Sequence, residues 1–258
     1  MTVTARRRAF VRGLLRWYRA HKRDLPWRRT SDPYRILVSE IMLQQTQVDR
    51  VVPKYHEFLR RYPSISALAS ASVGSVRETW YPLGYNIRPV RLHAIAREVV
   101  AAHDGRIPDD HGALLRLKGI GPYTAGAVLS FAYRLPVPIV DTNVRRVLQR
   151  VFYGQTKPPD SVLWRLAKNI LPKKTVYDFN QGLMDLGATV CVARSPRCEL
   201  CPVRGVCRAA PRFARELARR QRERREGARH GRRGAMQRPA AAASRAGSRR
   251  TARKDTAG

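Results

Sequence analysis

The sequence predicts an all-α protein, on two observations. Apolar residues recur three and four positions apart, as in Phe10, Leu14 and Trp17 and again in Ile95 and Val99, which is the period of a helix. Breaks rich in proline and glycine divide the chain into intervals of about 10–18 residues, the length of a short helix. We therefore expect some ten short helices before residue 210.

The breaks fall in chain order at Leu25-Pro26, Ser31–Pro33, Tyr62-Pro63, Tyr81-Pro82, Gly105–Asp110, Gly119–Pro122, Leu135–Pro138 and Lys157–Asp160. One segment, residues 137–140, has the composition of a strand. Pro136 precedes it and Pro138 interrupts it, which favours an extended linker that ends at Asp141. Residues 212–226 have the composition of a basic polar helix, and residues 227–258 that of a disordered segment. We therefore expect residues 211–258 to be a basic tail.

The charge of the chain predicts a polyanionic partner. The 258 residues are 43% hydrophobic, enough for a core without disulfides, but they carry a formal net charge of +32. Residues 212–258 hold 16 basic and 4 acidic side chains, so the rest of the chain is strongly basic as well. Nucleic acid is the first candidate partner. The alternative is a GC-rich genome that inflates the arginine content.

No segment resembles a secretory leader or a stretch of about 18 apolar residues, so we expect a bacterial cytoplasmic protein near the nucleoid, without membrane contact. All four cysteines, Cys191, Cys198, Cys201 and Cys207, lie within a short segment. In a reducing compartment such cysteines are metal ligands rather than disulfides. Four thiolates suit either tetrahedral zinc or an iron–sulfur cluster.

A glycine-rich turn predicts a grip on phosphate. Residues 112–130 place Leu117, Gly119, Ile120 and Gly121 between two apolar helical stretches. The glycines permit positive φ and close approach to a ligand, while Leu117 and Ile120 anchor the turn in the core. Amides at the start of the next helix point at an anion and hold a DNA phosphate without reading sequence. The alternative is an ordinary helix–turn–helix corner.

Continued by Thr124 and Ala125, this turn resembles the helix-hairpin-helix of DNA repair glycosylases, in which an acidic residue follows about twenty positions later. Asp141 lies at that place. An aspartate at a helix start is usually an N-cap. The resemblance implies a second role, in which the ionised carboxylate stabilises positive charge on the sugar while the base–sugar bond breaks. Asn143 then orients this carboxylate or a water molecule, or only caps the helix.

The resemblance extends to the MutY group of adenine-specific mismatch glycosylases and covers roughly residues 10–208. It is carried by the segments Arg23–Arg28, Ser39–Val48, Leu83–Tyr85 and Phe179–Ala188. It implies a monomer that acts on double-stranded DNA with a mispaired base. It also implies two helical subdomains that flank a cleft, one of residues 1–26 and 140–210 and the other of residues 27–139.

In that group the glutamate of the Ser39–Val48 segment protonates the adenine, and Glu40 holds its place. A general acid near neutral pH needs a raised pKa, which burial would supply, while Asp141 stays ionised. The alternative for Glu40 is an exposed helix carboxylate. Tyr123 occupies the position where bifunctional relatives carry a lysine, and a phenol forms no Schiff base. We therefore expect base removal without strand cleavage.

The resemblance implies DNA contacts as well. Gln44 and Gln45 correspond to residues beside the flipped base and its partner, and Tyr85 corresponds to an aromatic that wedges into the duplex. Tyr85 is alternatively a half-buried aromatic at a helix end. Arg28, within the first matching segment, is a further expected DNA contact. Thr124 is expected to add to the phosphate grip of the hairpin.

The cysteine spacing, C-x6-C-x2-C-x5-C, is similar to the [4Fe-4S] cluster loop of the MutY and endonuclease III group, which implies that cofactor rather than zinc. After Cys207 we expect too little apolar sequence for the C-terminal domain with which MutY proteins inspect 8-oxoguanine. A sister group that removes thymine or uracil opposite guanine is the alternative function. A DNA-binding module without activity is a third, disfavoured by the presence of both Glu40 and Asp141.

Overall fold

The computed structural model describes residues 2–85 and 87–236, with side chains to residue 223. In these residues the chain forms twelve α-helices with short 3-10 and π turns and contains no strand, which confirms the all-α prediction. Residues 137–140 are irregular, as expected of a linker. No helix of the described part is both long and apolar enough to span a membrane.

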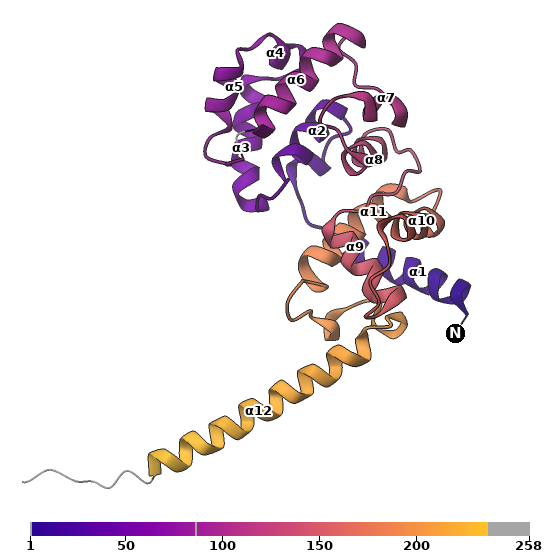
Figure 1. Cartoon of the computed structure of the whole chain (residues 1–258), viewed down its shortest axis with the longest axis vertical. Helices are drawn as coiled ribbons and strands as arrows, with labels where there is room; N and C mark the ends of the chain where they lie inside the picture. Colours follow the sequence, from indigo (N-terminus) through magenta and orange to yellow (C-terminus); the bar gives the residue numbers. More distant parts are fainter. Residues whose placement is uncertain (1, 86, 237–258) are drawn as a thin grey trace, which may run out of the picture. The chain divides into compact units, whose positions relative to one another are not determined.

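The first group of helices packs around Phe58 and Trp80, whose rings meet edge to face, and is drawn in indigo to magenta in Figure 1. It consists of α2 (Pro33–Met42), α3 (Val48–Arg61), α4 (Ile65–Ser70), α5 (Val73–Trp80), α6 (Ile87–Ala102), α7 (His111–Arg116) and α8 (Pro122–Phe131). Several of these helices begin at a side chain that accepts an amide hydrogen bond. Asp32, Ser64, Ser72 and Asp110 act in this way as N-caps.

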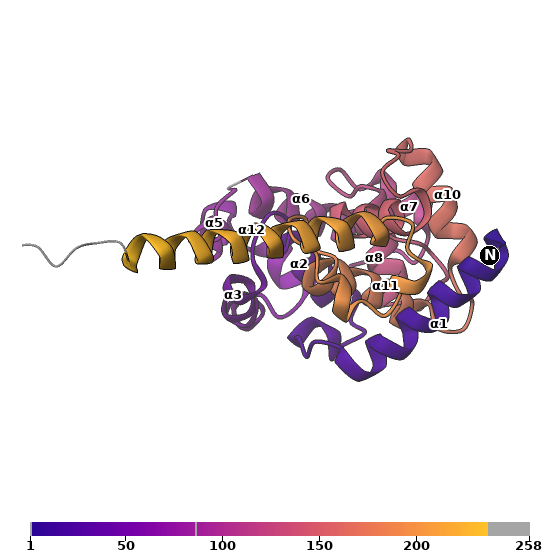
Figure 2. The same cartoon turned by 90° about the horizontal axis from the view of Figure 1, so that it is seen from below.

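The second group packs around Phe10, whose ring contacts Phe152 and Phe179 edge to face. It consists of α1 (Val3–His21), α9 (Thr142–Leu148), the π turn η2 (Gln149–Tyr153), α10 (Asp160–Ile170), α11 (Val176–Asp185) and the π turn η3 (Leu186–Val190). Figures 1 and 2 show α1 beside α11, although these helices lie far apart in the sequence. A Cβ at Gly182 would lie 3.1 Å from Cβ of Tyr18, so glycine permits this close approach.

The buried residues form two clusters that correspond to these groups. One runs from Leu25 to Ile139, and the other combines Phe10 and Leu14 with residues from Val140 to Val203. Leu25 packs into the first cluster, and the subdomain ranges of residues 1–26 with 140–210 and of residues 27–139 stay a prediction. Because the chain passes from one cluster to the other between Ile139 and Val140, Asp141 follows the crossing directly.

The basic tail differs from the prediction. The helix α12 (Ala210–Met236) runs ten residues past the predicted end at residue 226, so the disorder expected from residue 227 is wrong up to Met236. Arginine, alanine and glutamate favour helix, and Glu216 pairs with Arg220 one turn later. The expected disorder of residues 237–258 lies outside the described residues. The chain up to Phe213 is one compact unit, and residues from Ala214 belong to another.

Candidate functional site

Glu40 and Tyr123 meet inside the protein. The α2 helix carries Glu40, whose side chain is buried at 4% exposure, and the hydroxyl of Tyr123 in the first turn of α8 donates a 2.8 Å hydrogen bond to Oε2 of Glu40. The same hydroxyl lies 3.8 Å from the sulfur of Met184 on α11. The alternative considered for Glu40, an exposed helix carboxylate, is therefore excluded.

Burial raises the pKa of Glu40 to about 7, against an ordinary value near 4.5, because a charged carboxylate loses its hydration there. The hydrogen bond from Tyr123 opposes this by stabilising the charged form, and the negative charge of Asp141 adds to the rise. Burial raises the pKa of the Tyr123 phenol well above its usual range, so the phenol stays neutral and donates. A carboxyl with a pKa near 7 is suited to proton transfer at neutral pH.

Asp141 comes from the second cluster and caps α9. Its Oδ1 accepts a 2.6 Å hydrogen bond from the amide of Val144, and its Oδ2 accepts one of 3.2 Å from Nδ2 of Asn143. The capping role considered for Asp141 is thus present, and it leaves the carboxylate near enough to Glu40 to raise that residue's pKa. The structure brings together Glu40, Tyr123, Asp141 and Asn143, two residues from each cluster.

Arg146 connects this group to the cysteine loop. Its Nη2 donates 2.7 Å hydrogen bonds to Oδ1 of Asn143 and to the carbonyl of Gly187, and its Nε donates one of 2.7 Å to the carbonyl of Cys191. A Cβ at Gly187 would lie 2.7 Å from Cβ of Asn143, a separation that real Cβ atoms essentially never show. The sequence alone offered no signal for Arg146 beyond its place one turn after Asn143.

The turn expected to hold a phosphate is present, but Gly121 has a φ of −96° and does not use the positive φ that glycine permits, and the phosphate contact stays a prediction. Leu117 and Ile120 are buried, and Gly119 has a φ of +110°, a backbone conformation that residues other than glycine rarely adopt. Gly121 is the N-cap of α8 and has no side chain, so no capping side chain accepts a hydrogen bond from the first amides of α8. Thr124 is buried at 4% exposure as a whole residue, so the contact expected of it with a phosphate has no exposed side chain to make it.

Gln44, Gln45 and Tyr85 lie on two short loops, one after α2 and the other before α6. Gln44 is half-buried, Gln45 is exposed, and Tyr85 is 57% exposed. The half-buried alternative for Tyr85 is therefore wrong. Gln45 and Tyr85 both have positive φ, of 55° and 51°, which is unusual for residues other than glycine and costs free energy.

Arg28 does not have the role expected of it. Its side chain is 7% exposed, and its two terminal nitrogens each donate a 2.8 Å hydrogen bond to the carboxylate of Asp185, which Arg23 also binds. The two arginines lower the pKa of Asp185 and outweigh the effect of its burial. Arg28 therefore joins the chain before α2 to α11, and its guanidinium is not available to DNA.

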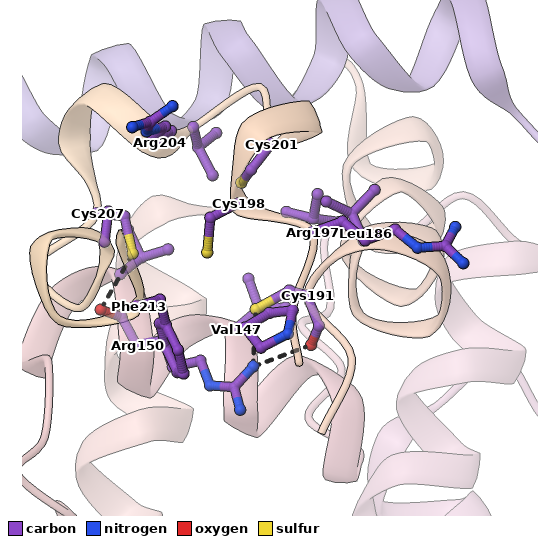
Figure 3. A pocket seen from close by; sticks show the side chains of 15 residues that line it. Val147, Arg150, Leu186, Cys191, Arg197, Cys198, Cys201, Arg204, Cys207 and Phe213 are labelled. Atoms are coloured by element: carbon purple, nitrogen blue, oxygen red, sulfur yellow. Dashed lines mark hydrogen bonds between the residues drawn. The ribbon is translucent and has the colours of Figure 1, made fainter. Parts of the chain in front are cut away.

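The four cysteines line one pocket with Val147, Arg150 and Phe213, and Figure 3 shows their sulfurs facing a common space. They are half-buried and form no disulfide, and Nη1 of Arg150 lies 3.4 Å from the sulfur of Cys191. Four cysteine sulfurs around one space suit a metal centre, either zinc or an iron–sulfur cluster.

Comparisons with known proteins agree with a site that combines a carboxyl of neutral-pH pKa, an N-capping aspartate, a glycine-rich hairpin and a cysteine pocket. Residues 38–173 match the HhH-GPD superfamily of base excision DNA repair proteins. The chain belongs to this superfamily. Residues 191–207 match the iron-sulfur binding domain of endonuclease III, so the cysteine loop is an iron–sulfur site.

Relatives of the chain include an adenine DNA glycosylase of Mycolicibacterium smegmatis, 48% identical over 74% of this chain and 66% of that protein. The human adenine DNA glycosylase is 42% identical over 81% of this chain and 40% of that protein. A thymine/uracil-DNA glycosylase of Pyrobaculum aerophilum is 40% identical, over 75% and 88%. The chain thus spans about two thirds or less of these two adenine enzymes, but most of the thymine/uracil enzyme.

Solved structures show the same fold. A thermostable thymine-DNA glycosylase has a TM-score of 0.77 and 33% identity, over 81% of this chain and 98% of that one. Endonuclease III in a non-covalent DNA complex has a TM-score of 0.74 and 20% identity, over 83% and 100%. These likenesses confirm the helix-hairpin-helix glycosylase fold that the hairpin and the matching segments predict.

Proposed function

We propose that this chain is a monofunctional DNA glycosylase that hydrolyses the bond between adenine and deoxyribose where adenine is mispaired with 8-oxoguanine or guanine in double-stranded DNA. The observation that carries the proposal is the buried Glu40, which is held by a neutral phenol and protonated up to about pH 7. The similarity to adenine DNA glycosylases from mycobacteria to man supports adenine as the base.

In this mechanism the two carboxyl groups have opposite tasks. Glu40 in its neutral form delivers a proton to a ring nitrogen of the flipped-out adenine, which turns the base into a better leaving group. The carboxylate of Asp141 faces the positive charge that develops on the sugar as the bond breaks. The donors from Val144 and Asn143 hold the Asp141 carboxylate in place before the charge develops.

Tyr123 supports base removal without strand cleavage. Its hydroxyl stays neutral and is already bonded to Glu40, and a phenol provides no amine that forms a Schiff base with the sugar. We expect abasic product that is cut only after alkali is added. Strand cleavage before alkali would contradict this part of the proposal.

Cys191, Cys198, Cys201 and Cys207 would hold the [4Fe-4S] cluster, which would serve to order the loop of residues 191–207. The hairpin amides and the strongly basic surface would bind the DNA backbone. We further propose that the enzyme acts as a monomer and works on the bacterial chromosome in the cytoplasm.

Removal of thymine or uracil opposite guanine is a second candidate function. The likeness to the Pyrobaculum enzyme over 88% of its length, and to a solved thymine-DNA glycosylase, favours it. The exposed Gln45 and Tyr85, beside Gln44, instead resemble the motifs of the adenine enzymes. The two candidates therefore differ in the base that enters the pocket, and an assay of the released base separates them.

The deciding experiment measures base release by the native, cluster-containing chain on duplexes with A opposite 8-oxoguanine, A opposite G, T opposite G and U opposite G. We expect adenine release that Glu40→Gln lowers by about 10²–10⁴-fold, because the general acid is lost. Asp141→Asn should lower it by about 10²–10³-fold through lost charge stabilisation.

The matched controls are Glu78→Gln and Asp109→Asn, since both residues are exposed carboxylates of the first group. Both should keep the rate of the unchanged protein. Release of thymine or uracil alone would replace the first candidate by the second. Full activity of Asp141→Asn on every duplex would reject the assigned mechanism.

A further inference from the structure

Arg88 is a buried cation without a carboxylate partner. It stands in the first turn of α6 at 4% exposure, and no acidic side chain in the described ranges pairs with its guanidinium. Burial of a charge is unfavourable unless hydrogen bonds replace the lost water, so the position of this arginine demands compensating contacts.

Backbone carbonyls of two separate loops supply those contacts. Nη1 donates to the carbonyls of Met42 at 2.8 Å, of Ile41 and of Gln44, at and just beyond the end of α2. These carbonyls carry the negative end of the helix dipole, which suits a cation. Nη2 donates to the carbonyls of Leu83 and Gly84 in the loop before α6.

Both terminal nitrogens of Arg88 bind the loop after α2. Nη1 donates to the carbonyl of Gln44, and Nη2 donates a 3.0 Å hydrogen bond to the hydroxyl of Thr46. The ring of Tyr85 lies 5.2 Å from Cζ of Arg88, and the ring of Trp80 lies 5.4 Å from it. One planar group thus holds residues 41–46 and 83–85 in a single arrangement.

Each of these loops presents one exposed residue in a strained conformation. Gln45 and Tyr85 both have positive φ, which persists only where the surroundings impose it. Arg88 donates hydrogen bonds to the carbonyl of the residue immediately before each one, Gln44 before Gln45 and Gly84 before Tyr85. The guanidinium is therefore placed to maintain both strained positions together.

We propose that Arg88 is a positioning residue that fixes the two loops relative to each other, so that Gln45 and Tyr85 enter a DNA duplex as a pair at the mispaired base. This inference rests on the proposed function, because it assigns the two side chains to the disturbed base pair. It adds that recognition of the mismatch depends on the relative placement of the loops and not only on the side chains at their tips.

The variant Arg88→Lys tests the proposal. A lysine side chain keeps the positive charge but lacks the planar guanidinium that donates hydrogen bonds to both loops at once. The full, cluster-containing chain is titrated with matched duplex and with duplex carrying 2-aminopurine opposite guanine, a fluorescent adenine analogue that brightens when it leaves the stack. We expect Arg88→Lys to lower the preference for mismatched over matched duplex by about tenfold and to abolish the rise in fluorescence. Affinity for matched duplex should change by no more than about twofold.

The matched control is Arg97→Lys, the same change at an exposed position of α6, which should preserve the preference and the fluorescence. In the Gln45→Ala/Tyr85→Ala background, Arg88→Lys should lower the preference no further, because it acts through those residues. A purely structural role would instead reduce matched binding and iron content together. That result, or an unchanged preference in Arg88→Lys, would overturn the proposal.

If Arg88→Lys does not fold, Thr46→Val decides, since it removes a single acceptor of the guanidinium and keeps the shape of the side chain. We expect a smaller loss of preference, about two- to threefold, and no loss would count against the proposal. These readouts require no base release. Failure of the proposed function, seen as no adenine release by the unchanged protein, is therefore distinguishable from failure of this inference.

Discussion

Glu40 and Asp141 are both carboxylic acids, but they lie in different surroundings. Glu40 is buried beside a phenol, and its pKa rises to about 7. Asp141 accepts hydrogen bonds from the amide of Val144 and from the side chain of Asn143. A pair of carboxyl groups in different environments is the pattern expected where one donates a proton and the other stabilises developing positive charge.

The hydrogen bond from the Tyr123 phenol to Glu40 influences the pH above which the proposed enzyme loses activity. This hydrogen bond lowers the pKa of Glu40, so Tyr123→Phe should raise that pKa further and keep Glu40 protonated at higher pH. In single-turnover assays, the unchanged protein should lose activity as pH rises through about 7. The variant should lose it at a higher pH.

Tyr133→Phe serves as the control, because its hydroxyl binds the carbonyl of Ile107 instead of Glu40. Its pH profile should match that of the unchanged protein. A shift of the Tyr123→Phe profile to lower pH would show that Glu40 is not the titrating acid.

At the scale of elements, Asp141 owes its position to close backbone packing. The linker of residues 132–141 passes over α8 at Gly126, where a Cβ would lie 2.7 Å from the carbonyl of Pro138. On the other side, Asn143 lies against Gly187 of η3. Asn180 of α11 donates to the carbonyl of Val137 and to the hydroxyl of Ser130, which ties the linker to both clusters.

Gly187→Ala should therefore disturb the site more than its size suggests. The new methyl group would meet Cβ of Asn143 and the backbone of that residue, so α9 must move away from η3. We expect a loss of about 1–3 kcal/mol in stability, measured by denaturant unfolding, and a lower rate of base release.

Gly74→Ala is the matched comparison, because its Cβ would have only one neighbour, the hydroxyl of Ser72 at 3.9 Å. Gly74 lies in the first turn of α5, where alanine is compatible with the helix, so this variant should keep its stability or gain up to about 1 kcal/mol. Equal stability and activity in both variants would contradict the packing argument.

At the scale of the whole molecule, positive charge lies both on the compact unit and on α12. Arg212, Arg215, Arg219 and Arg222 recur at helical spacing on α12 and are exposed. Such a stripe suits a row of phosphates without reading their sequence. The charge excess is thus divided between a unit that carries the chemistry and a helix that carries none of the candidate catalytic residues.

The triple change Arg215→Gln/Arg219→Gln/Arg222→Gln should weaken binding to matched duplex. The logarithmic salt dependence of binding should fall by about 0.9 for each phosphate that the helix no longer neutralises, as measured by titration at several salt concentrations. Base release at saturating enzyme should stay unchanged, since these residues lie far along the chain from Glu40 and Asp141.

The same three positions changed to lysine retain the charge and should restore the salt dependence. An unaltered salt slope in the glutamine variant would show that α12 does not contact DNA.

The sequence by itself determined the fold class, the family and most of the candidate site, because these depend on local patterns. Helical period, the Leu117–Gly121 turn and the cysteine spacing are each contained in a short stretch of chain. Glu40, Tyr123 and Asp141 were identified from motifs, and the structure brings them together.

Only the tertiary structure decided how charged groups are compensated, because their partners lie far away in the chain. Arg28 belongs to a matching motif, but Asp185 from α11 occupies its guanidinium. Arg88 has no sequence signal of its own, since its partners are carbonyls, which every residue possesses. The raised pKa of Glu40 likewise depends on burial, and burial arises only when the two helix groups pack.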